Sequence, residues 1–364
     1  MGDSANTPEH PGELVTREEL ALAARNHGMP LELLRHPVTP IGAHYLLTHF
    51  DVPFIDPVSW RLTVGGQVAR PLVLDLDDVR DRPAVTRRVT LECAGNGRAR
   101  LTPRRLSQPW LWEAVGTGEW TGTPLRGVLA EAGLDDAALE VVFTGADRGV
   151  QDGIAHAYER SLRTDDALAD EVLLVYALNG QPLPPQHGAP LRLLVPGWYG
   201  MASVKWLERI TAVDAPFEGY QQAHAYRYRS DADPRGVPLS RIAPRALMVP
   251  PGVPEFWSRR RLLPAGTHVL EGRAWSGWGP ITSVTVSADG GRSWRSAAVE
   301  ERPGPAAWHR WTASWEAGEP GDYELCCRAE DAAGNIQPLQ PPWNPDGYAV
   351  NDVHRVAVSV TPTP

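Results

Sequence analysis

The sequence predicts an α+β protein of two domains, in which a mixed α/β domain is followed by an immunoglobulin-like β-sandwich. The chain has 364 residues, more than one typical domain requires. From about residue 41 to 245, short strand-like segments alternate with loops and a few helices. After about residue 256, short strands follow one another between turn residues, which is typical of a β-sandwich.

Composition is that of an ordinary globular protein, with 42% hydrophobic and 22% charged residues. The net charge of −9 argues against a nucleic-acid-binding surface, because phosphate binding needs clustered Lys and Arg. The 35 prolines favour loops and edge strands over long helices. Three cysteines cannot form a disulfide framework. The adjacent Cys326 and Cys327 would point to opposite faces of a strand.

Residues 1–40 are predicted to be a leader segment with one short helix at about 17–27, ending near Gly28 and Pro30. The start of the chain is polar and acidic, without the basic and apolar regions of a secretory signal. No run of about 18 apolar residues predicts a membrane span. We therefore expect a cytoplasmic protein, or a periplasmic one if a leader has been removed.

Periodicity and turn residues predict the elements of the first domain, which we place at residues 41–245. The segment 125–133 has helical spacing and a helix stop at Gly133. A Gly65–Gly66 turn is expected after a strand that alternates apolar and polar residues. The other predicted elements are strands at 60–64, 88–92, 139–144 and 191–195 and a short helix at 74–79.

The second domain is placed at residues 246–364. The Pro-rich stretch 247–256 is interpreted as a linker. Turn residues such as Asp289-Gly290-Gly291 separate the strand-like segments that follow it. These segments are 268–275, 281–287, 308–315 and 323–330.

Cys93 is the first candidate for chemistry. It follows a strand and precedes a turn of small residues, Ala94-Gly-Asn-Gly97, where the backbone can approach a ligand closely. Arg98 could lower the pKa of the thiol or hold an anion. A lone cysteine is also commonly a small buried hydrophobe, and the residues alone leave both interpretations open.

The segment 185–206 is the second candidate. Gly197 and Gly200 would leave backbone amides open in a loop, while Arg192, Ser203 and Lys205 add charge and a hydroxyl group. This set suits a phosphate or another anion. The same residues fit a strand–turn–strand with solvated charges equally well. A nucleotide-binding P-loop is disfavoured because its pattern is missing.

Several blocks in order make the family resemblance specific. Leu91-Glu-Cys-Ala-Gly-Asn-Gly-Arg98 resembles the cysteine loop of sulfite oxidases and assimilatory nitrate reductases. The blocks 186–197 and 204–207 resemble the next blocks of that family. The pieces 272–277, 286–294 and 342–348 resemble its dimerisation domain. The resemblance extends from about residue 41 to 360 and is to the haem-free bacterial form of the family.

The resemblance implies a molybdenum bound by one protein thiolate and a pterin dithiolene, a cofactor for which a soft thiolate is a suitable ligand. It further implies a homodimer without a fused haem or flavin module. Tyr226 is the candidate active-site tyrosine, and the less favoured alternative is a packed aromatic with a satisfied hydroxyl. By motif, Cys93 binds the metal, Arg98 lies near substrate or cofactor, and His187, Arg192, Ser203 and Lys205 bind the pterin or its phosphate.

The chain also departs from the family. Without gaps, Thr48 replaces the arginine that faces sulfite, and Phe50 replaces a histidine; a shift of one residue lets His49 serve, and we favour His49 near the cofactor. In the second domain, the loop 276–280 ends in Pro280 and lacks an expected basic residue. Fewer arginines bind a dianion less well, so Trp278 is predicted to wall a pocket for an organic S-oxide or thioether instead.

The resemblance favours oxidation of sulfite to sulfate, with electrons passed to an external acceptor such as a cytochrome or oxygen. One alternative on the same scaffold is reduction of an S-oxide such as methionine sulfoxide, or of nitrate. An alternative of another class is a non-enzymatic β-sandwich interaction protein that has lost its cofactor. The substrate is thus expected to be a small anion or an S-oxide.

Overall fold

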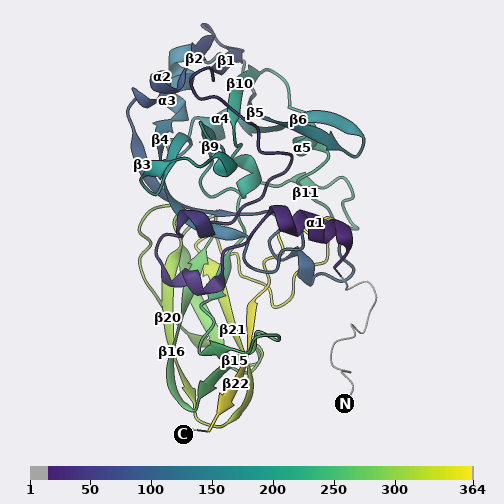
Figure 1. Cartoon of the computed structure of the whole chain (residues 1–364), viewed down its shortest axis with the longest axis vertical. Helices are drawn as coiled ribbons and strands as arrows, with labels where there is room; N and C mark the ends of the chain where they lie inside the picture. Colours follow the sequence, from purple (N-terminus) through teal and green to yellow (C-terminus); the bar gives the residue numbers. More distant parts are fainter. Residues whose placement is uncertain (1–14, 363–364) are drawn as a thin grey trace.

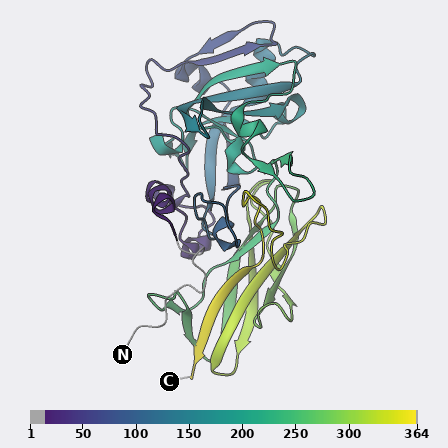
Figure 2. The same cartoon turned by 90° about the vertical axis from the view of Figure 1, so that its right-hand side faces the viewer.

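The computed structural model describes residues 15–362, which form two lobes stacked along the long axis (Figures 1 and 2). The first lobe is purple to teal in Figure 1, the second is green to yellow, and the N-terminal helices lie beside their junction. Residues 1–14, on which part of the prediction about a secretory signal depends, lie outside the described residues. Within residues 15–362, no helix has both the length and the apolar character needed to cross a bilayer.

Helices are short, as the prolines predicted. α3 buries Leu125, Val128, Leu129 and Ala132, which is the one-sided spacing of an amphipathic helix. Gly133 ends it at φ +68°, which confirms the predicted stop. The α-helices are α1 Arg17–Arg25, α2 Leu76–Arg80, α3 Leu125–Ala132, α4 Thr164–Ala167 and α5 Tyr220–Ala223. Single 3₁₀ turns occupy Leu31–Arg35, Ile41–Ala43, Arg98–Arg100, Pro185–His187 and Gly200–Ala202.

Two sheets build the first lobe. One has the order β2-β1-β10-β5-β6, in which only the β1–β10 pair is parallel. Its strands are β1 Leu62–Gly66, β2 Leu72–Leu74, β5 Glu140–Gln151, β6 Ile154–Arg163 and β10 Leu207–Val213. The other has the order β3-β4-β7-β8 with β9 beside β7. Its strands are β3 Val85–Glu92, β4 Val115–Pro124, β7 Leu173–Leu178, β8 Gln181–Pro182 and β9 Arg192–Leu194.

The second lobe is the predicted β-sandwich of antiparallel sheets, with one parallel pair, β15–β22. β22 shows why it forms: Val356, Val358 and Val360 alternate with more exposed residues and face the sandwich core. One sheet contains β13 Arg245–Met248, β16 Gly266–Trp275, β19 Ala298–Val299 and β20 His309–Ala317. The other contains β14 Val253–Pro254, β15 Arg261–Pro264, β17 Ile281–Ser287, β18 Arg295–Ser296, β21 Gly321–Asp331 and β22 His354–Thr361. A two-stranded ladder, β11 Arg227–Tyr228 with β12 Val237–Pro238, precedes this lobe.

Two local predictions were wrong. The supposed linker at 247–256 begins inside β13, where Leu247 and Met248 are fully buried and paired with β16. The expected Gly65–Gly66 turn is the end of β1, paired with β10. Gly66 is required there because, at φ +83°, a Cβ atom would lie 2.1 Å from the carbonyl oxygen of Ala212. Prolines and glycines marked both stretches, but tertiary pairing decided their structure.

The second lobe holds the end of β3 in place. Glu92, the last residue of β3, pairs with Arg245 of β13 at 2.7 Å, and both side chains are 1% exposed. The indole N–H of Trp275 donates to the other Glu92 oxygen at 2.8 Å. Since Cys93 follows Glu92 directly, the position of this cysteine depends on both lobes.

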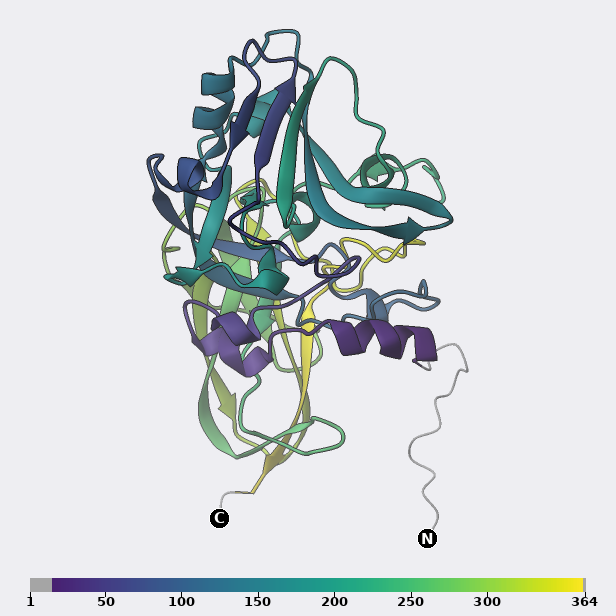
Figure 3. The same ribbon diagram turned by 45° about the horizontal axis from the view of Figure 1, so that its top comes forward.

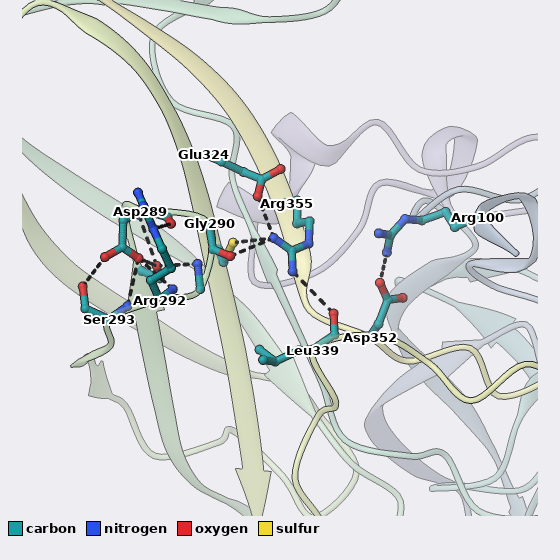
Figure 4. Close-up of polar contacts among 12 residues, drawn as sticks. Arg100, Asp289, Gly290, Arg292, Ser293, Glu324, Leu339, Asp352 and Arg355 are labelled. Atoms are coloured by element: carbon teal, nitrogen blue, oxygen red, sulfur yellow. Dashed lines mark hydrogen bonds and ion pairs between the residues drawn. The ribbon is translucent and has the colours of Figure 1, made fainter. Parts of the chain in front are cut away.

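Two ion pairs hold the C-terminal segment, one just before β22 and one within it (Figure 4). Asp352 pairs with Arg100 of the first lobe. Arg355 pairs with Glu324 of β21 at 2.6 Å and donates to the carbonyl oxygen of Gly290 at 3.1 Å. These contacts fix the chain that leads out of a loop at 344–348, which returns to the first lobe.

Candidate functional site

Cys93 lies where two cavities meet. We call them the inner cavity and the larger outer cavity. Cys93, Leu47, His49 and Tyr226 line both. The predicted catalytic cysteine, the favoured histidine and the candidate tyrosine are therefore brought together at one junction.

Hydrogen bonding, backbone conformation and limited space explain Asn96, Gly97 and Gly95 in the loop after β3. Asn96 is 1% exposed and accepts the backbone N–H of Ala114 while its amide donates to Glu92 and to the carbonyl oxygen of Trp112. Gly97 adopts φ +95°, which favours glycine. At Gly95 a Cβ atom would lie 2.7 to 2.9 Å from the guanidinium of Arg98. The turn therefore lets Arg98 fold back beside Cys93.

The Cys93 side chain is a buried thiol in this arrangement. Burial raises its pKa, and the positive charge of Arg98 acts in the opposite direction. No three His, Cys, Asp or Glu side chains among residues 15–362 are grouped as a metal-binding set. A single soft thiolate such as that of Cys93 is a suitable ligand for a metal that a cofactor also holds. Cys326 and Cys327 lie on β21 in the second lobe, away from both cavities.

Predicted pterin-binding residues gather in the inner cavity. Pro185–His187, β9 and the 200–205 segment converge there, so residues from separate sequence blocks meet. The residues of the original prediction found here are His49, His187, Arg192, Ser203 and Lys205. Lining residues that the sequence did not predict include His44, Tyr45, Asp147 and Tyr158.

Lys205 is the sole lysine of the chain. Its ammonium donates to the carbonyl oxygens of Leu47 at 2.8 Å and Gln186 at 3.3 Å. Burial, and then the charge of Arg192, lower the pKa of Lys205 to about 7. Burial raises the pKa of Asp147 to about 6, although Lys205 opposes that shift. Burial in this cavity therefore disfavours the charged forms of the side chains that line it.

Burial disfavours the charged forms of Arg192 and His187 as well. Arg192 donates to the carbonyl oxygens of His187 at 3.1 Å and Ser203 at 3.2 Å, while its buried Nε has no partner among the described residues. Burial lowers the pKa of Arg192 to about 10. Burial lowers the pKa of His187 to about 2, with His44 and Arg192 acting in the same direction.

An anionic organic cofactor fits the inner cavity on these grounds. Two buried cations, Arg192 and Lys205, face one carboxyl group, Asp147, whose Oδ1 has no partner in the described chain. Nε2 of His44 is likewise buried without a partner among residues 15–362. Ser203 accepts the backbone N–H of Val195 at 3.1 Å, which leaves its hydroxyl proton free to donate. A phosphate would pair with the ammonium of Lys205, the free Nε of Arg192 and the hydroxyl of Ser203.

The outer cavity contains three arginines around one carboxylate. Asp346 pairs with Arg105 at 2.5 Å and with Arg229 at 2.6 Å. Its carbonyl oxygen accepts from Nε of Arg98 at 3.0 Å. Arg98 also donates to Ser107 at 2.8 Å, and its guanidinium lies 4.9 Å from the ring centroid of Tyr348. The cavity is cationic overall, and its charges are already paired and oriented.

His49 also lies at the junction of the two cavities. Its Nε2 lies 2.8 Å from Oε1 of Gln151 and 3.1 Å from Nε2 of Gln221. Burial lowers the pKa of His49. Thr48 and Phe50 also line the outer cavity. Thr48, where the family resemblance led us to expect an arginine, is an uncharged residue of this cavity, to which Arg105 and Arg229 contribute two positive charges.

Tyr226 is 5% exposed, and its ring lies 5.2 Å from that of Tyr348 and 6.4 Å from that of His49. Its phenol is within hydrogen-bonding reach of Tyr158. Tyr158 in turn donates to the carbonyl oxygen of Met201 at 2.8 Å. The tyrosine is both packed and directed at the site, so the two sequence interpretations are compatible.

The predicted role of the loop 276–280 was wrong. Trp278 and Pro280 line neither cavity, and Trp278 is 53% exposed. Ser276 donates to Asp331 at 2.7 Å, and Gly277 packs against the backbone of Gly197. Gly197 therefore serves contact between the lobes rather than anion binding, because only glycine pairs allow such close backbone approach.

Sequence reasoning missed the contribution of the second lobe to the site. The stretch 342–348 resembled a dimerisation domain, so Asp346 and Tyr348 were not considered as site residues. A charged and an aromatic residue in a Pro- and Gly-rich loop were the available signal. Arg105, seven residues after Arg98, and Arg229, three after Tyr226, were similarly close to predicted residues.

Two family models match the chain. The oxidoreductase molybdopterin-binding domain matches residues 49–221, and the Mo-co oxidoreductase dimerisation domain matches residues 258–361. Sulfite oxidase from Gallus gallus is 34% identical over 374 residues, covering 97% of this chain and 79% of that protein. The chain belongs to the sulfite oxidase family of molybdopterin oxidoreductases.

Another relative and one solved structure are consistent with this family assignment. Mitochondrial sulfite oxidase from Homo sapiens is 36% identical over 352 residues, which cover 92% of this chain. The chain spans about 64% of the length of that relative. Among solved structures, the sulfane dehydrogenase SoxCD from Paracoccus pantotrophus superimposes with a TM-score of 0.79 at 25% identity, covering 99% of this chain and 95% of the matched chain.

Proposed function

We propose that this family member is a molybdopterin-dependent oxidoreductase that oxidises sulfite to sulfate and passes the electrons to an external acceptor. The observation that carries the proposal is the position of Cys93, a single thiol between a cationic inner cavity and an arginine-lined outer cavity. The inner cavity suits a resident anionic cofactor, and the outer cavity suits a small anion that enters and leaves.

In the inner cavity, Lys205 and Arg192 would neutralise the pterin phosphate, and His187 and Ser203 would orient it. Cys93 would supply the thiolate ligand to the metal. When bound, the molybdenum cofactor supplies the oxygen-atom transfer and two-electron chemistry. Binding of a cation also favours deprotonation of the thiol, which burial alone opposes.

In the outer cavity, Arg98 would hold sulfite by its oxygens and leave the sulfur lone pair free to form the new S–O bond. Asp346 and Ser107 fix the guanidinium plane of Arg98, so the anion meets an oriented donor. The phenol of Tyr226 would stabilise negative charge at the junction. Overall, sulfite and water give sulfate, two protons and two electrons, and His49 is the nearest candidate to relay a proton.

Steady-state oxidation of sulfite by ferricyanide and by cytochrome c, on protein with quantified molybdenum, tests this function. Turnover with saturation at micromolar sulfite and about one molybdenum per chain is the expected result. Full metal content with negligible sulfite turnover would contradict it. Methionine sulfoxide and nitrate, offered with a reduced dye, would then identify an oxygen-abstracting reaction instead.

The match to a dimerisation domain at residues 258–361 supports a dimer, and we propose a homodimer formed by the second lobe. Light scattering on the purified protein would measure twice the mass of the 364-residue chain. A monomer at all concentrations would contradict this part of the proposal. A cytochrome is the proposed electron acceptor, and comparison of its reduction rate with that of oxygen consumption tests the choice.

A further inference from the structure

One wall of the outer cavity is apolar and more exposed than a sulfite site needs. Ile154, at the start of β6, is 47% exposed, and its side chain lies on the same face of the hairpin as that of its ladder partner Gln151. Leu106, from the loop after Cys93, is 54% exposed, and Leu22 of α1 also lines the cavity. The β5–β6 hairpin and α1 lie on the same side of the molecule (Figure 3). These side chains have nothing apolar to cover them.

This wall is built into the hairpin rather than accidental. Phe50 packs so closely over Gly149 that a Cβ atom there would lie 2.2 Å from its ring. The ring of Phe50 also lies 5.3 Å from that of His156 on β6. The apolar hairpin end is thereby tied to the segment that carries His49, the residue shared by both cavities.

The rest of the cavity wall recognises an anion. Arg98, Arg105 and Arg229 are oriented by Asp346, and three arginines against two carboxylates, Asp346 and Asp152, leave the cavity positive. The described chain makes no hydrogen bond to Nη2 of Arg98, whose Nε and Nη1 are both occupied. A ligand with oxygen acceptors on one end and a hydrocarbon group on the other would use both walls.

We propose that the outer cavity accepts organic sulfinates, R–SO₂⁻, and that the chain oxidises them to sulfonates. This inference rests on the proposed function, since it uses the same oxygen transfer. The two sulfinate oxygens bind the arginines, the sulfur lone pair forms the new S–O bond, and the R group lies against Ile154 and Leu106. The R–S bond stays intact.

The reaction balances with the same acceptor: R–SO₂⁻ and water give R–SO₃⁻, two protons and two electrons. A thioether or a neutral sulfoxide would leave the arginines without an anion. Sulfite, with no hydrocarbon group, would leave the apolar wall exposed to water. A sulfinate is the class that satisfies both walls and still carries a sulfur lone pair.

Kinetics with sulfite, methanesulfinate and benzenesulfinate on the molybdenum-loaded protein test the proposal. We expect benzenesulfinate to have a KM about tenfold below that of methanesulfinate, because the ring covers the apolar wall. In an Ile154→Thr variant, the ratio of kcat/KM for benzenesulfinate to that for sulfite should fall about fivefold. Threonine keeps the β-branched shape and the strand propensity.

Val269→Thr is the matched control, because Val269 is 72% exposed on β16 and lines neither cavity. It should leave the ratio unchanged. Calorimetric binding of benzenesulfonate, the unreactive product, gives a readout without turnover. It should bind the wild-type protein more tightly than sulfate does, and the Thr variant should lose most of that preference.

The outcomes separate the two proposals. Turnover of sulfite without turnover of either sulfinate would overturn the inference and leave the proposed function standing. Sulfinate turnover with an unchanged ratio in the Thr variant would also overturn it, because the apolar wall would then have no role. Fully loaded protein that oxidises neither sulfite nor sulfinates would overturn the proposed function itself, and the inference with it.

Discussion

The inner and outer cavities meet at Cys93 but handle charge in opposite ways. In the inner cavity, Lys205 and Arg192 are buried with depressed pKa values, and several polar atoms lack partners within the described residues. In the outer cavity, Arg105 and Arg229 are already paired with Asp346. A site left strained suits a permanently bound cofactor, whereas a site satisfied by itself suits a ligand that exchanges.

The two cavities also differ in which lobe supplies their residues. Every predicted pterin-binding residue comes from the first lobe. The outer cavity takes Asp346 and Tyr348 from the second lobe, whose loop 344–348 is fixed by hydrogen bonds between Asn344 and Tyr348. The outer cavity is therefore built by both lobes, whereas the predicted pterin-binding residues come from one.

The largest effect is expected where the cavities meet. Cys93→Ser should lower turnover on the order of 10³-fold or more, because a hydroxyl is a poor substitute for a soft thiolate ligand. The fold should persist, since the change removes little volume. Steady-state kinetics and circular dichroism measure both. Cys326→Ser on β21 is the matched control and should keep full activity; a fully active Cys93→Ser variant would refute the assignment.

A second substitution is expected to weaken only cofactor binding in the inner cavity. Lys205→Met should reduce the molybdopterin content of purified protein by about tenfold, because one charge-assisted hydrogen bond to an anion is lost. Fluorescence of the released, oxidised pterin measures this content. Arg209→Gln, on the exposed face of β10, should leave it unchanged. Unchanged cofactor content in both variants would mean that Lys205 does not bind the cofactor.

The stability of the cofactor-free protein should rise with pH between about 7 and 10. Burial holds the pKa of Lys205 at about 7 in the folded state, well below the ordinary value for lysine. The unfolded chain then binds more protons in this window, so the free energy of unfolding gains up to about 1.4 kcal/mol per pH unit. Denaturant titrations measure it, and a slope that Lys205→Met does not reduce would contradict the account.

The smallest effect is expected in the outer cavity, where charges are shared. Asp346→Asn should lower both the KM for sulfite and the inhibition constant for sulfate about fivefold, because Arg105 and Arg229 lose their competing anion. The dependence of KM on salt should steepen. Asp322→Asn, a surface partner of Arg260 in the same lobe, is the control. An increased KM would show that Asp346 acts mainly by orienting the arginines.

The sequence predicted most of the inner site and little of the outer one, for a physical reason. Cys93, His187, Arg192, Ser203 and Lys205 lie in contiguous motifs whose spacing can be recognised. The arginine cluster forms only when loops around residues 98–105, 229 and 344–348 pack together across the lobes. No local pattern encodes such a contact.

Fold prediction shows the same limit. Strand alternation identified β16, β17, β20 and β21, and a glycine stop identified α3. Prolines and glycines misled at 247–256 and at Gly66, where pairing with a distant strand outweighs local turn preference. The same long-range packing moved Trp278 out of the pocket that it was expected to wall.

The central claim is that the Cys93 thiolate binds the molybdenum of a cofactor held in the inner cavity. X-ray absorption at the molybdenum edge tests this claim most directly, on wild-type and Cys93→Ser protein loaded to equal metal content. We predict one fewer sulfur scatterer around molybdenum in the variant, with the pterin sulfurs unchanged. Identical sulfur shells in the two proteins would contradict the claim.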